Sequence, residues 1–183
     1  MDDSELQLIR ATGKDDHEAF EHLVKRYQNP LLNFVYRYVG NRQTAEDLTQ
    51  EVFLQVYRAA ARFEPKARVS TWVFKIAYNL CMNEMKRRKR LASYELELHM
   101  RGEQSLTSLS PDAVEQFGLK QFMMKTLTQL PEKQRAALLL RVTEEFSYQE
   151  ISDVLGVSRA SVESLLFRAR ERLRQLLARD EME

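Results

Sequence analysis

Hydrophobic residues recur at three- and four-residue steps through most of the chain, the spacing that places them on one face of an α-helix. The clearest run begins near His17 and lasts to Val39, and Gly40-Asn41 follows it as a helix end. Pro30 falls inside this run and predicts a kink or a split. The N-terminal half is expected to form helices over 5–11, 17–39, 44–63 and 70–90, the last one capped by Ser70 or Thr71.

The periodicity fades over 91–110, where glycine, glutamine, serine and threonine give the composition of a linker. Ser110-Pro111-Asp112 then has the pattern of a helix start, and helices are expected at about 112–129, 131–143, 148–155 and 159–178. The chain has 5 glycines and 4 prolines in 183 residues, which favours helices over tight turns. The predicted fold is all-α: an N-terminal helical bundle (1–90), a flexible linker (91–110) and a C-terminal helix-turn-helix domain (111–183).

Residues 147–158 have the pattern of a helix-turn-helix. Ser147 and Glu150 form a capping box, Gly156-Val157 ends the short helix that follows, and Ser158 caps the next one. Two helices joined by a short turn that contains glycine are typical of duplex DNA readers, but plain helical hairpins share this outline. The pattern alone leaves both interpretations open.

The helix after this turn has an unusual polar face. An apolar stripe runs from Val162 to Leu176, and Phe167 falls on the opposite side beside Ser164 and Arg168. An exposed phenyl ring among polar groups suits the major groove, where it can touch a thymine methyl group. Arginines at every second position over 168–174 wrap around the helix and could hold phosphates on both sides of a groove. The alternative is that Phe167 packs against the linker or the other domain.

The formal net charge of +1 conceals a local excess of cations. Residues 1–65 carry 8 basic and 11 acidic side chains, residues 66–90 carry 8 and 1, and residues 91–183 carry 12 and 15. Five consecutive cations occupy 86–90, at the end of a predicted helix. This excess favours a polyanionic partner, and a solvated surface is the alternative.

The predicted helix at 70–90 combines this charge with amides. Its core face holds Phe74, Ala77, Tyr78, Cys81 and Met85, so a redox role for the cysteine is not expected. The opposite face holds Lys75, Asn79, Asn83, Lys86 and Arg90, with Trp72 and Ile76 alongside. Amides, cations and an aromatic ring are the groups that bind single-stranded nucleic acid. The alternative is an ordinary amphipathic helix. The loop before it, with Lys66 and Arg68, either closes over an extruded base or is a simple turn.

The predicted helix at 44–63 leaves large apolar residues outside its core stripe. Phe53 and Leu54 lie beside Asp47 and Gln50 on a helical projection. Exposed apolar surface with a polar rim suggests a protein partner. A second helix of the same bundle is an equally good explanation.

Composition argues against several classes of protein. No apolar run reaches the length of about 18 residues that a membrane span needs, and the acidic start does not resemble a signal peptide, so a soluble cytoplasmic protein is expected. The single Cys81 excludes an internal disulfide. The three histidines match no metal-ligand spacing, and no glycine-rich phosphate loop exists. We therefore expect no enzyme, no catalytic residue, no metal and no cofactor.

Four stretches, taken in order, resemble the extracytoplasmic-function (ECF) sigma factors over nearly the whole chain. They are 20–27 (FEHLVKRY), 45–53 (AEDLTQEVF), 70–79 (STWVFKIAYN) and the C-terminal set 130–135, 148–151 and 167–170 (LPEKQR, YQEI and FRAR). Each stretch alone is a moderate signal, but their order and spacing together are a strong one. The resemblance implies a non-enzymatic subunit that brings RNA polymerase to stress-response promoters.

The resemblance also implies roles for particular residues. The N-terminal domain would dock on the clamp helices of the largest polymerase subunit through Asp47, Gln50, Glu51, Phe53 and Leu54. The minus-10 element would be read as a melted single strand by Lys66, Arg68, Trp72, Lys75, Ile76, Asn79, Asn83, Lys86 and Arg90, with Ile76 and Asn79 lining the pocket of a flipped base. The minus-35 element would be read as duplex by Ser158, Arg159, Ser161, Glu163, Ser164, Phe167, Arg168 and Arg170. Further implied partners are the flap of the second-largest subunit and an anti-sigma factor, and the linker would run toward the RNA exit path.

The recognition helix departs from the family at two positions. Glu163 and Leu165 stand where many members carry a cation and an arginine. Glu163 could accept a hydrogen bond from a cytosine amino group, so the minus-35 sequence of relatives cannot be assumed. A conventional helix-turn-helix regulator with a helical sensing domain is the alternative function. Such a regulator would bind duplex DNA tightly by itself and would not need the amide and cation face at 70–90.

Overall fold

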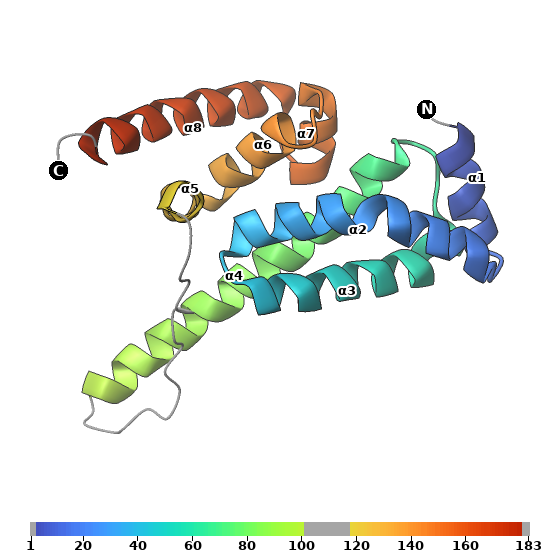
Figure 1. Ribbon diagram of the computed structural model, residues 1–183, viewed down its shortest axis with the longest axis horizontal. Helices are drawn as coiled ribbons and strands as arrows, with labels where there is room; N and C mark the ends of the chain where they lie inside the picture. The colour runs from blue at the N-terminus through green and yellow to red at the C-terminus, as the bar shows by residue number, and fades with distance from the viewer. Residues whose placement is uncertain (1–2, 101–117, 181–183) are drawn as a thin grey trace.

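The fold is known from a computed structural model that describes the backbone of residues 3–100 and 118–180 and the side chains of 3–95 and 123–178. The described residues form helices joined by short turns and contain no strand, so the all-α prediction is confirmed (Figure 1). In chain order the elements are α1 (Asp3–Thr12), α2 (His17–Val39), α3 (Arg42–Ala59), the 3-10 helix η1 (Ala60–Arg62), α4 (Val69–Met100), α5 (Gly118–Thr128), α6 (Glu132–Val142), α7 (Tyr148–Leu155) and α8 (Arg159–Asp180).

Helix α2 begins and ends where its sequence pattern predicts. Asp16 caps the start by accepting a hydrogen bond from the Ala19 amide at 3.0 Å. Gly40 ends the helix in the left-handed conformation, with φ 77°, and its amide donates to the Tyr36 carbonyl at 2.9 Å. The split predicted at Pro30 does not occur, because α2 continues through it. The cost of an interior proline, about 3 kcal/mol, is outweighed by the apolar face that α2 buries along its whole length.

The N-terminal half is a bundle in which α2 packs against α1, α3 and α4. Its centre is apolar: Phe34, Val52, Val56 and Phe74 are all less than 2% exposed. Such close packing leaves few gaps, and large-to-small changes in this centre would create cavities. The bundle therefore gives rigid support to the outer faces of α3 and α4.

Helix α4 begins earlier than predicted. Its first turn starts at Val69, and the Trp72 amide donates to the Arg68 carbonyl at 3.1 Å. Neither Ser70 nor Thr71 is therefore the N-cap, and that prediction was wrong. Val69 and Thr71 are both buried, so tertiary packing rather than a capping side chain sets the start of the helix.

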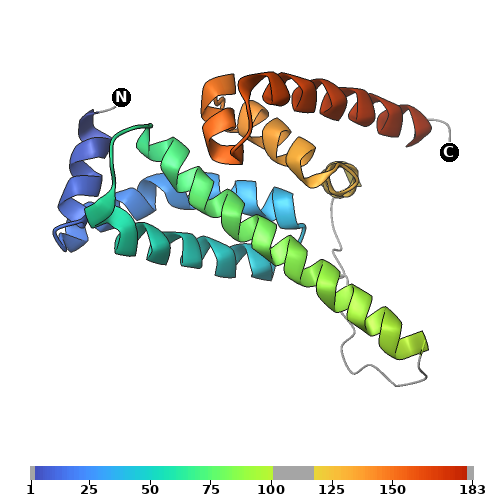
Figure 2. The same ribbon diagram turned by 180° about the vertical axis from the view of Figure 1, so that it is seen from behind.

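Helix α4 also ends later than predicted, at Met100 rather than near Arg90 (Figure 2). The first ten residues of the expected linker, 91–100, are thus helical. This segment is rich in leucine and glutamate, whose high helix propensity sustains a helix without an amphipathic pattern. The rest of the expected linker and the cap at Ser110-Pro111-Asp112 lie outside the described residues.

The C-terminal half contains the predicted helix-turn-helix. The capping box is confirmed: Ser147 Oγ accepts from the Glu150 amide at 3.2 Å, and Glu150 Oε2 accepts from the Ser147 amide at 2.8 Å. Helix α7 ends at Gly156, which has φ 62°. Ser158 then caps α8 by accepting from the Ser161 amide at 3.2 Å. Helix α5 was expected from residue 112, and the described part of it begins at residue 118.

The two halves pack against each other. Helix α7 lies on the first turns of α4, and α5 and α6 lie on α2 (Figures 1 and 2). The rings of Phe74 and Phe146 meet edge to face across this boundary, 5.3 Å between centroids, and both side chains are buried. The buried apolar residues of both halves therefore form one continuous cluster.

Candidate nucleic-acid and polymerase interfaces

The outer face of α4 carries the amides and cations that the sequence predicts there. Lys75, Asn79 and Asn83 are exposed, as are Lys86 and Arg90. They follow one another at three- and four-residue steps, so a single rigid helix presents them in a line. On the opposite side, four of the five predicted core residues, Phe74, Ala77, Tyr78 and Cys81, are buried, and Met85 is half-buried.

Two apolar side chains lie beside this polar line. Trp72 and Ile76 are half-buried, and the Trp72 ring meets Phe63 edge to face at 5.0 Å between centroids. Phe63 comes from the segment after η1, so it holds the indole in one orientation. The arrangement offers a fixed aromatic and aliphatic surface next to hydrogen-bonding amides, which suits an unstacked base.

Each of the two cations of the 64–68 loop is paired with an acid. Lys66 forms an ion pair with Glu64 in the same loop. Arg68 Nη1 lies 3.1 Å from Glu150 Oε1 of the helix-turn-helix. Arg68 therefore touches the C-terminal half, a contact that the sequence pattern did not predict.

Some of the five basic residues at 86–90 are hydrogen-bonded within the protein, and others are exposed to solvent. Arg87 donates two hydrogen bonds to Glu84, at 2.7 and 2.9 Å, and Arg88 Nε donates a third at 2.8 Å. Arg88 also donates to the Val39 carbonyl at 3.0 Å and to the Thr44 hydroxyl at 2.8 Å. Arg88 thus joins the end of α2, the start of α3 and α4, whereas Lys86 and Arg90 point to solvent.

Glu84 was not among the predicted functional residues. It is the one acid in 66–90 and is buried at the side of α4, where hydrogen bonds, chiefly from Arg87, lower the pKa of its carboxyl group. In the sequence, the signal for these contacts was the position of Glu84, three residues before Arg87 and four before Arg88. Cys81, one turn earlier, is fully buried, and burial raises the pKa of its thiol to about 12.

The predicted docking face on α3 is exposed only in part. Asp47 and Gln50 are exposed, and Leu54 keeps 49% of its surface open. Glu51 and Phe53 are half-buried, and the Phe53 ring meets Phe20 of α2 edge to face at 6.5 Å. Phe53 therefore packs on another helix of the same bundle, as the second explanation predicts, whereas Leu54 faces outward.

The outer face of α8 is open along the whole predicted recognition surface. Each of the predicted minus-35 contacts is exposed, namely Ser158, Arg159, Ser161, Glu163, Ser164, Phe167, Arg168 and Arg170. Phe167 is 65% exposed, so it does not pack on the described part of the N-terminal half, and packing against the rest of the linker lies outside the described residues. Val162, Leu166 and Ala169 are buried on the other side, which confirms the projection of this helix.

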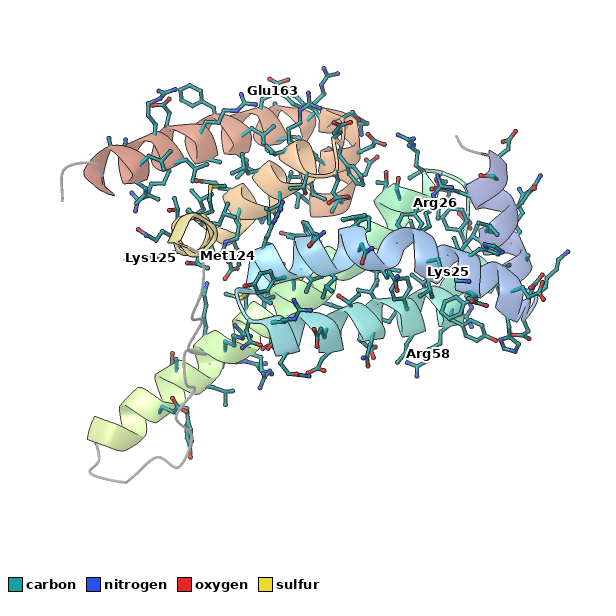
Figure 3. All side chains as sticks on the ribbon, viewed as in Figure 1. Lys25, Arg26, Arg58, Met124, Lys125 and Glu163 are labelled. Atoms are coloured by element: carbon teal, nitrogen blue, oxygen red, sulfur yellow. The ribbon has the colours of Figure 1, made fainter. Side chains whose placement is uncertain are left out.

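A shallow hollow on α8 is lined by Glu163, Ser164, Phe167 and Arg168. Figure 3 shows Glu163 on the side of α8 that faces away from α6. Its carboxylate lies 3.9 Å from Arg159 one turn earlier, a distance that leaves oxygen lone pairs open to another donor. The hollow combines an acceptor, a hydroxyl group, a ring and a guanidinium, which are the groups that read base edges.

The described residues contain neither a candidate metal site nor a candidate membrane span. Their side chains form no cluster of three or more histidine, cysteine or acidic residues that could hold a metal ion. Within the same residues, no helix has the length and apolar character to cross a membrane.

Solved structures with the same fold include CnrH in complex with the cytosolic domain of CnrY, with a TM-score of 0.72 at 23% identity over 97% of this chain and 99% of that one. A second is the sigma factor RpoE in complex with the anti-sigma factor NepR from Bartonella quintana. It has a TM-score of 0.69 at 25% identity over 87% of this chain and 96% of that chain. The likeness to CnrH shows a shared fold, and in both comparisons the match covers most of this chain and most of the matched chain.

Sequence comparison gives the family. Residues 23–91 match Sigma-70 region 2, and residues 123–173 match Sigma-70 region 4. ECF RNA polymerase sigma factor SigW of Bacillus subtilis is 31% identical over 92% of this chain and 94% of its own length. The RNA polymerase sigma-H factor of Pseudomonas aeruginosa is 32% identical over 96% and 94%. The chain therefore belongs to the ECF group of RNA polymerase sigma factors.

Proposed function

We propose that this sigma factor reads its promoter with two different helices, one for melted and one for duplex DNA. Residues 1–90 would dock on polymerase and hold the minus-10 element, and residues 111–183 would bind the minus-35 element. Residues 91–110 would connect these two domains. The observation that carries the proposal is the line of exposed amides and cations on α4 beside the fixed Trp72 ring.

On α4, Asn79 and Ile76 would receive a base of the non-template strand. Trp72 and Lys75 border the same stretch of the helix, and Asn83, Lys86 and Arg90 continue it. Stacking on a side chain and hydrogen bonds to the Watson–Crick edge are available only to unpaired bases, whereas the cations attract phosphates in either form of DNA. Lys66 and Arg68 would join this surface once they leave their acidic partners.

On α8, the exposed face would enter the major groove of the minus-35 element. Phe167 would touch a thymine methyl group, and Glu163 would accept from a cytosine amino group. The arginines at 168 and 170 and the serines at 158 and 161 would hold the phosphates that flank these bases. Helix α7 would cross the backbone, as the first helix of this motif does.

The outer face of α3 would dock on the clamp helices of the largest polymerase subunit. Asp47 and Gln50 supply polar contacts, and Leu54 supplies an apolar anchor. Glu51 borders them, and Phe53 supports the face from inside the bundle. The C-terminal domain would contact the flap of the second-largest subunit, and the whole protein would act in the cytoplasm as a non-catalytic subunit.

An anti-sigma factor is a further proposed partner. The related RpoE was solved with the anti-sigma factor NepR. In this chain an apolar groove of about 810 Å³ lies between the two halves, with the exposed side chains Met123, Val142 and Leu177 along it. An amphipathic helix of the anti-sigma factor would fit such a groove.

The test is binding to core RNA polymerase and promoter-dependent transcription. The double variant Asp47→Ala/Gln50→Ala should weaken core binding, because it removes the polar docking contacts. Asn79→Ala should bind core normally and fail in initiation on duplex promoters, with rescue on templates that are already melted at the minus-10 element.

Matched controls come from α2, where Glu21 and Gln28 are exposed and belong to neither proposed surface. The variants Glu21→Ala/Gln28→Ala and Gln28→Ala should behave as the wild type in both assays. The proposal would be wrong if Asn79→Ala initiated normally, or if the free chain bound duplex promoter DNA tightly without core. The second result would instead favour a conventional helix-turn-helix regulator.

A further inference from the structure

The first two turns of α8 lack the side chains that read purines. Residues 160–167 (ASVESLLF) contain no lysine, arginine, asparagine, glutamine or histidine, and Glu163 is their one charged residue. In the major groove, guanine is read by arginine or lysine, and adenine is read by asparagine or glutamine. The nearest cations, Arg159 and Arg168, lie just outside this stretch at its two ends. The stretch itself therefore offers no long donor side chain to a base.

The hydroxyl groups of this stretch do not supply the missing donors. Ser164 Oγ donates to the Ala160 carbonyl at 3.1 Å, so its proton is used within the helix, while its exposed lone pairs can still accept. Ser161 Oγ lies 2.8 Å from Ser158 Oγ, and these two hydroxyl groups are bonded to each other. Ala160 and Phe167 add exposed apolar surface. The outer face thus combines acceptors with apolar groups.

Glu163 is an unusual residue for a helix face that meets DNA. Its side chain is 56% exposed, and the Nε atom of Arg159 lies 3.9 Å from its carboxylate, beyond hydrogen-bond distance. Phosphates repel a carboxylate, so Glu163 weakens DNA binding unless a base donates a hydrogen bond to it. The amino group of cytosine is such a donor. Adenine also presents an amino group, but its N7 acceptor lies beside that group and repels the carboxylate.

Phe167 and Glu163 lie on the same hollow of α8, which has a volume of about 420 Å³. They are one helical turn apart, a spacing that places Cβ atoms about 5–6 Å from each other. Successive bases of one DNA strand rise by about 3.4 Å, so two side chains in one hollow meet neighbouring bases. The apolar ring suits the C5 methyl group of thymine. The hollow therefore matches the exposed edges of two adjacent pyrimidines.

We propose that this hollow selects a two-base pyrimidine step on one strand, in which Glu163 accepts from the amino group of a cytosine and Phe167 contacts the methyl group of the adjacent thymine. The inference rests on the proposed binding of α8 to the minus-35 element, and it adds the class of bases that α8 selects. Guanine is rejected at the cytosine position, because its two acceptors meet the carboxylate oxygens. Arg159 and Arg168 flank the step and bind phosphates.

The experiment uses the full chain assembled with core polymerase and a promoter library in which only the minus-35 duplex is randomised. Sequencing of the bound DNA should show a cytosine next to a thymine at fixed positions of one strand. In the selected duplex, uracil in place of that thymine removes only the methyl group and should weaken binding roughly fourfold, the effect of one buried methyl group. Phe167→Ala should bind the thymine and uracil duplexes equally.

Exchange of the acceptor for a donor tests the cytosine contact. Glu163→Arg places a guanidinium where the carboxylate was and should move the preference at that position from cytosine to guanine, by roughly tenfold in relative affinity. The matched control is Glu171→Arg, eight residues later on the same outer face. The carboxylate of Glu171 lies 2.5 Å from Arg174 Nη1, so it is already paired, and its loss should leave the selected sequence unchanged.

Three results would overturn the inference and leave duplex reading by α8 intact. They are a selected sequence without the cytosine and thymine step, equal binding of the thymine and uracil duplexes by the wild type, and an unchanged selection by Glu163→Arg. Sensitivity to uracil that persists in Phe167→Ala would overturn the role of the ring. A library from which no minus-35 sequence is selected would contradict the proposed function itself, and the inference with it.

Discussion

Helices α4 and α8 both carry several basic residues, but these residues differ in their contacts. In α4, Arg87 and Arg88 bind Glu84, and Arg88 reaches the carbonyl that ends α2. In α8, within the described part of the chain, the arginines at 168, 170 and 172 have no acidic partner within 4.0 Å. The α4 run therefore serves the fold as well as the proposed DNA interface.

The cause of this difference is local. Glu84 lies three and four residues before two arginines and is held at a buried edge of the helix, close to the end of α2. A helix end carries unpaired carbonyls, which a guanidinium satisfies. The α8 arginines lie on a helix whose outer face meets solvent, so their charge stays available. A run of cations thus indicates an interface only where no buried acid or helix end lies within its reach.

The largest expected effect comes from Arg88→Ala. This variant removes hydrogen bonds to Glu84, the Val39 carbonyl and Thr44 together, and it should lower the free energy of unfolding by about 2–3 kcal/mol. Arg90→Ala is the matched control two residues away and should change it by less than about 0.5 kcal/mol. Urea denaturation measures both. Equal losses for the two variants would contradict the division of the basic run.

A smaller effect is expected from Phe167→Ala on α8. Because the ring is 65% exposed, the free energy of unfolding should change by less than about 0.5 kcal/mol. Affinity of the holoenzyme for a minus-35 duplex should fall by about 1–2 kcal/mol, or roughly 5- to 30-fold, if the ring contacts a base. Fluorescence anisotropy with labelled DNA measures it, with Gln175→Ala as the control on the same helix. Unchanged affinity would remove Phe167 from the recognition surface.

The smallest effect is a pH dependence. The pKa of Glu84 is lowered in the folded chain, so its contribution to stability is complete above its unfolded pKa of about 4.5 and is lost as pH falls through the folded value. Glu84→Gln removes this contribution at all pH values. The stability difference between wild type and Glu84→Gln should therefore be constant near neutral pH and shrink below about pH 4.5. A difference that grows on acidification would contradict the assigned role.

Much of the fold followed from local signals in the sequence. The bounds of α2 and α7 were predicted correctly because a capping side chain or a left-handed glycine marks each end. The start of α4 was wrong because packing of Val69 and Thr71, rather than a cap, sets it. Its end was wrong because helix propensity continues after the amphipathic pattern stops.

The exposed members of the candidate site were also predictable, since helical projection separates Asn79 from Cys81 and Phe167 from Leu166. The contacts that Arg88 and Arg135 make with distant parts of the chain were not. Their partners Val39 and Tyr38 lie 49 and 97 residues away in the chain, and only the tertiary structure brings them together. Contacts between the two halves could not be predicted from patterns along single helices.

The central claim is that α4 reads melted DNA and α8 reads duplex DNA. Its most direct test is crosslinking between DNA and the wild-type protein in the assembled promoter complex. Photoreactive bases are placed singly in the non-template strand of the minus-10 element and in the minus-35 duplex, and the crosslinked peptides are identified by mass spectrometry. The account predicts that minus-10 bases crosslink to residues 69–90, only when the strand is melted, and that minus-35 bases crosslink to residues 158–170. Crosslinks from both elements to α8, or from minus-10 bases in intact duplex to α4, would contradict it.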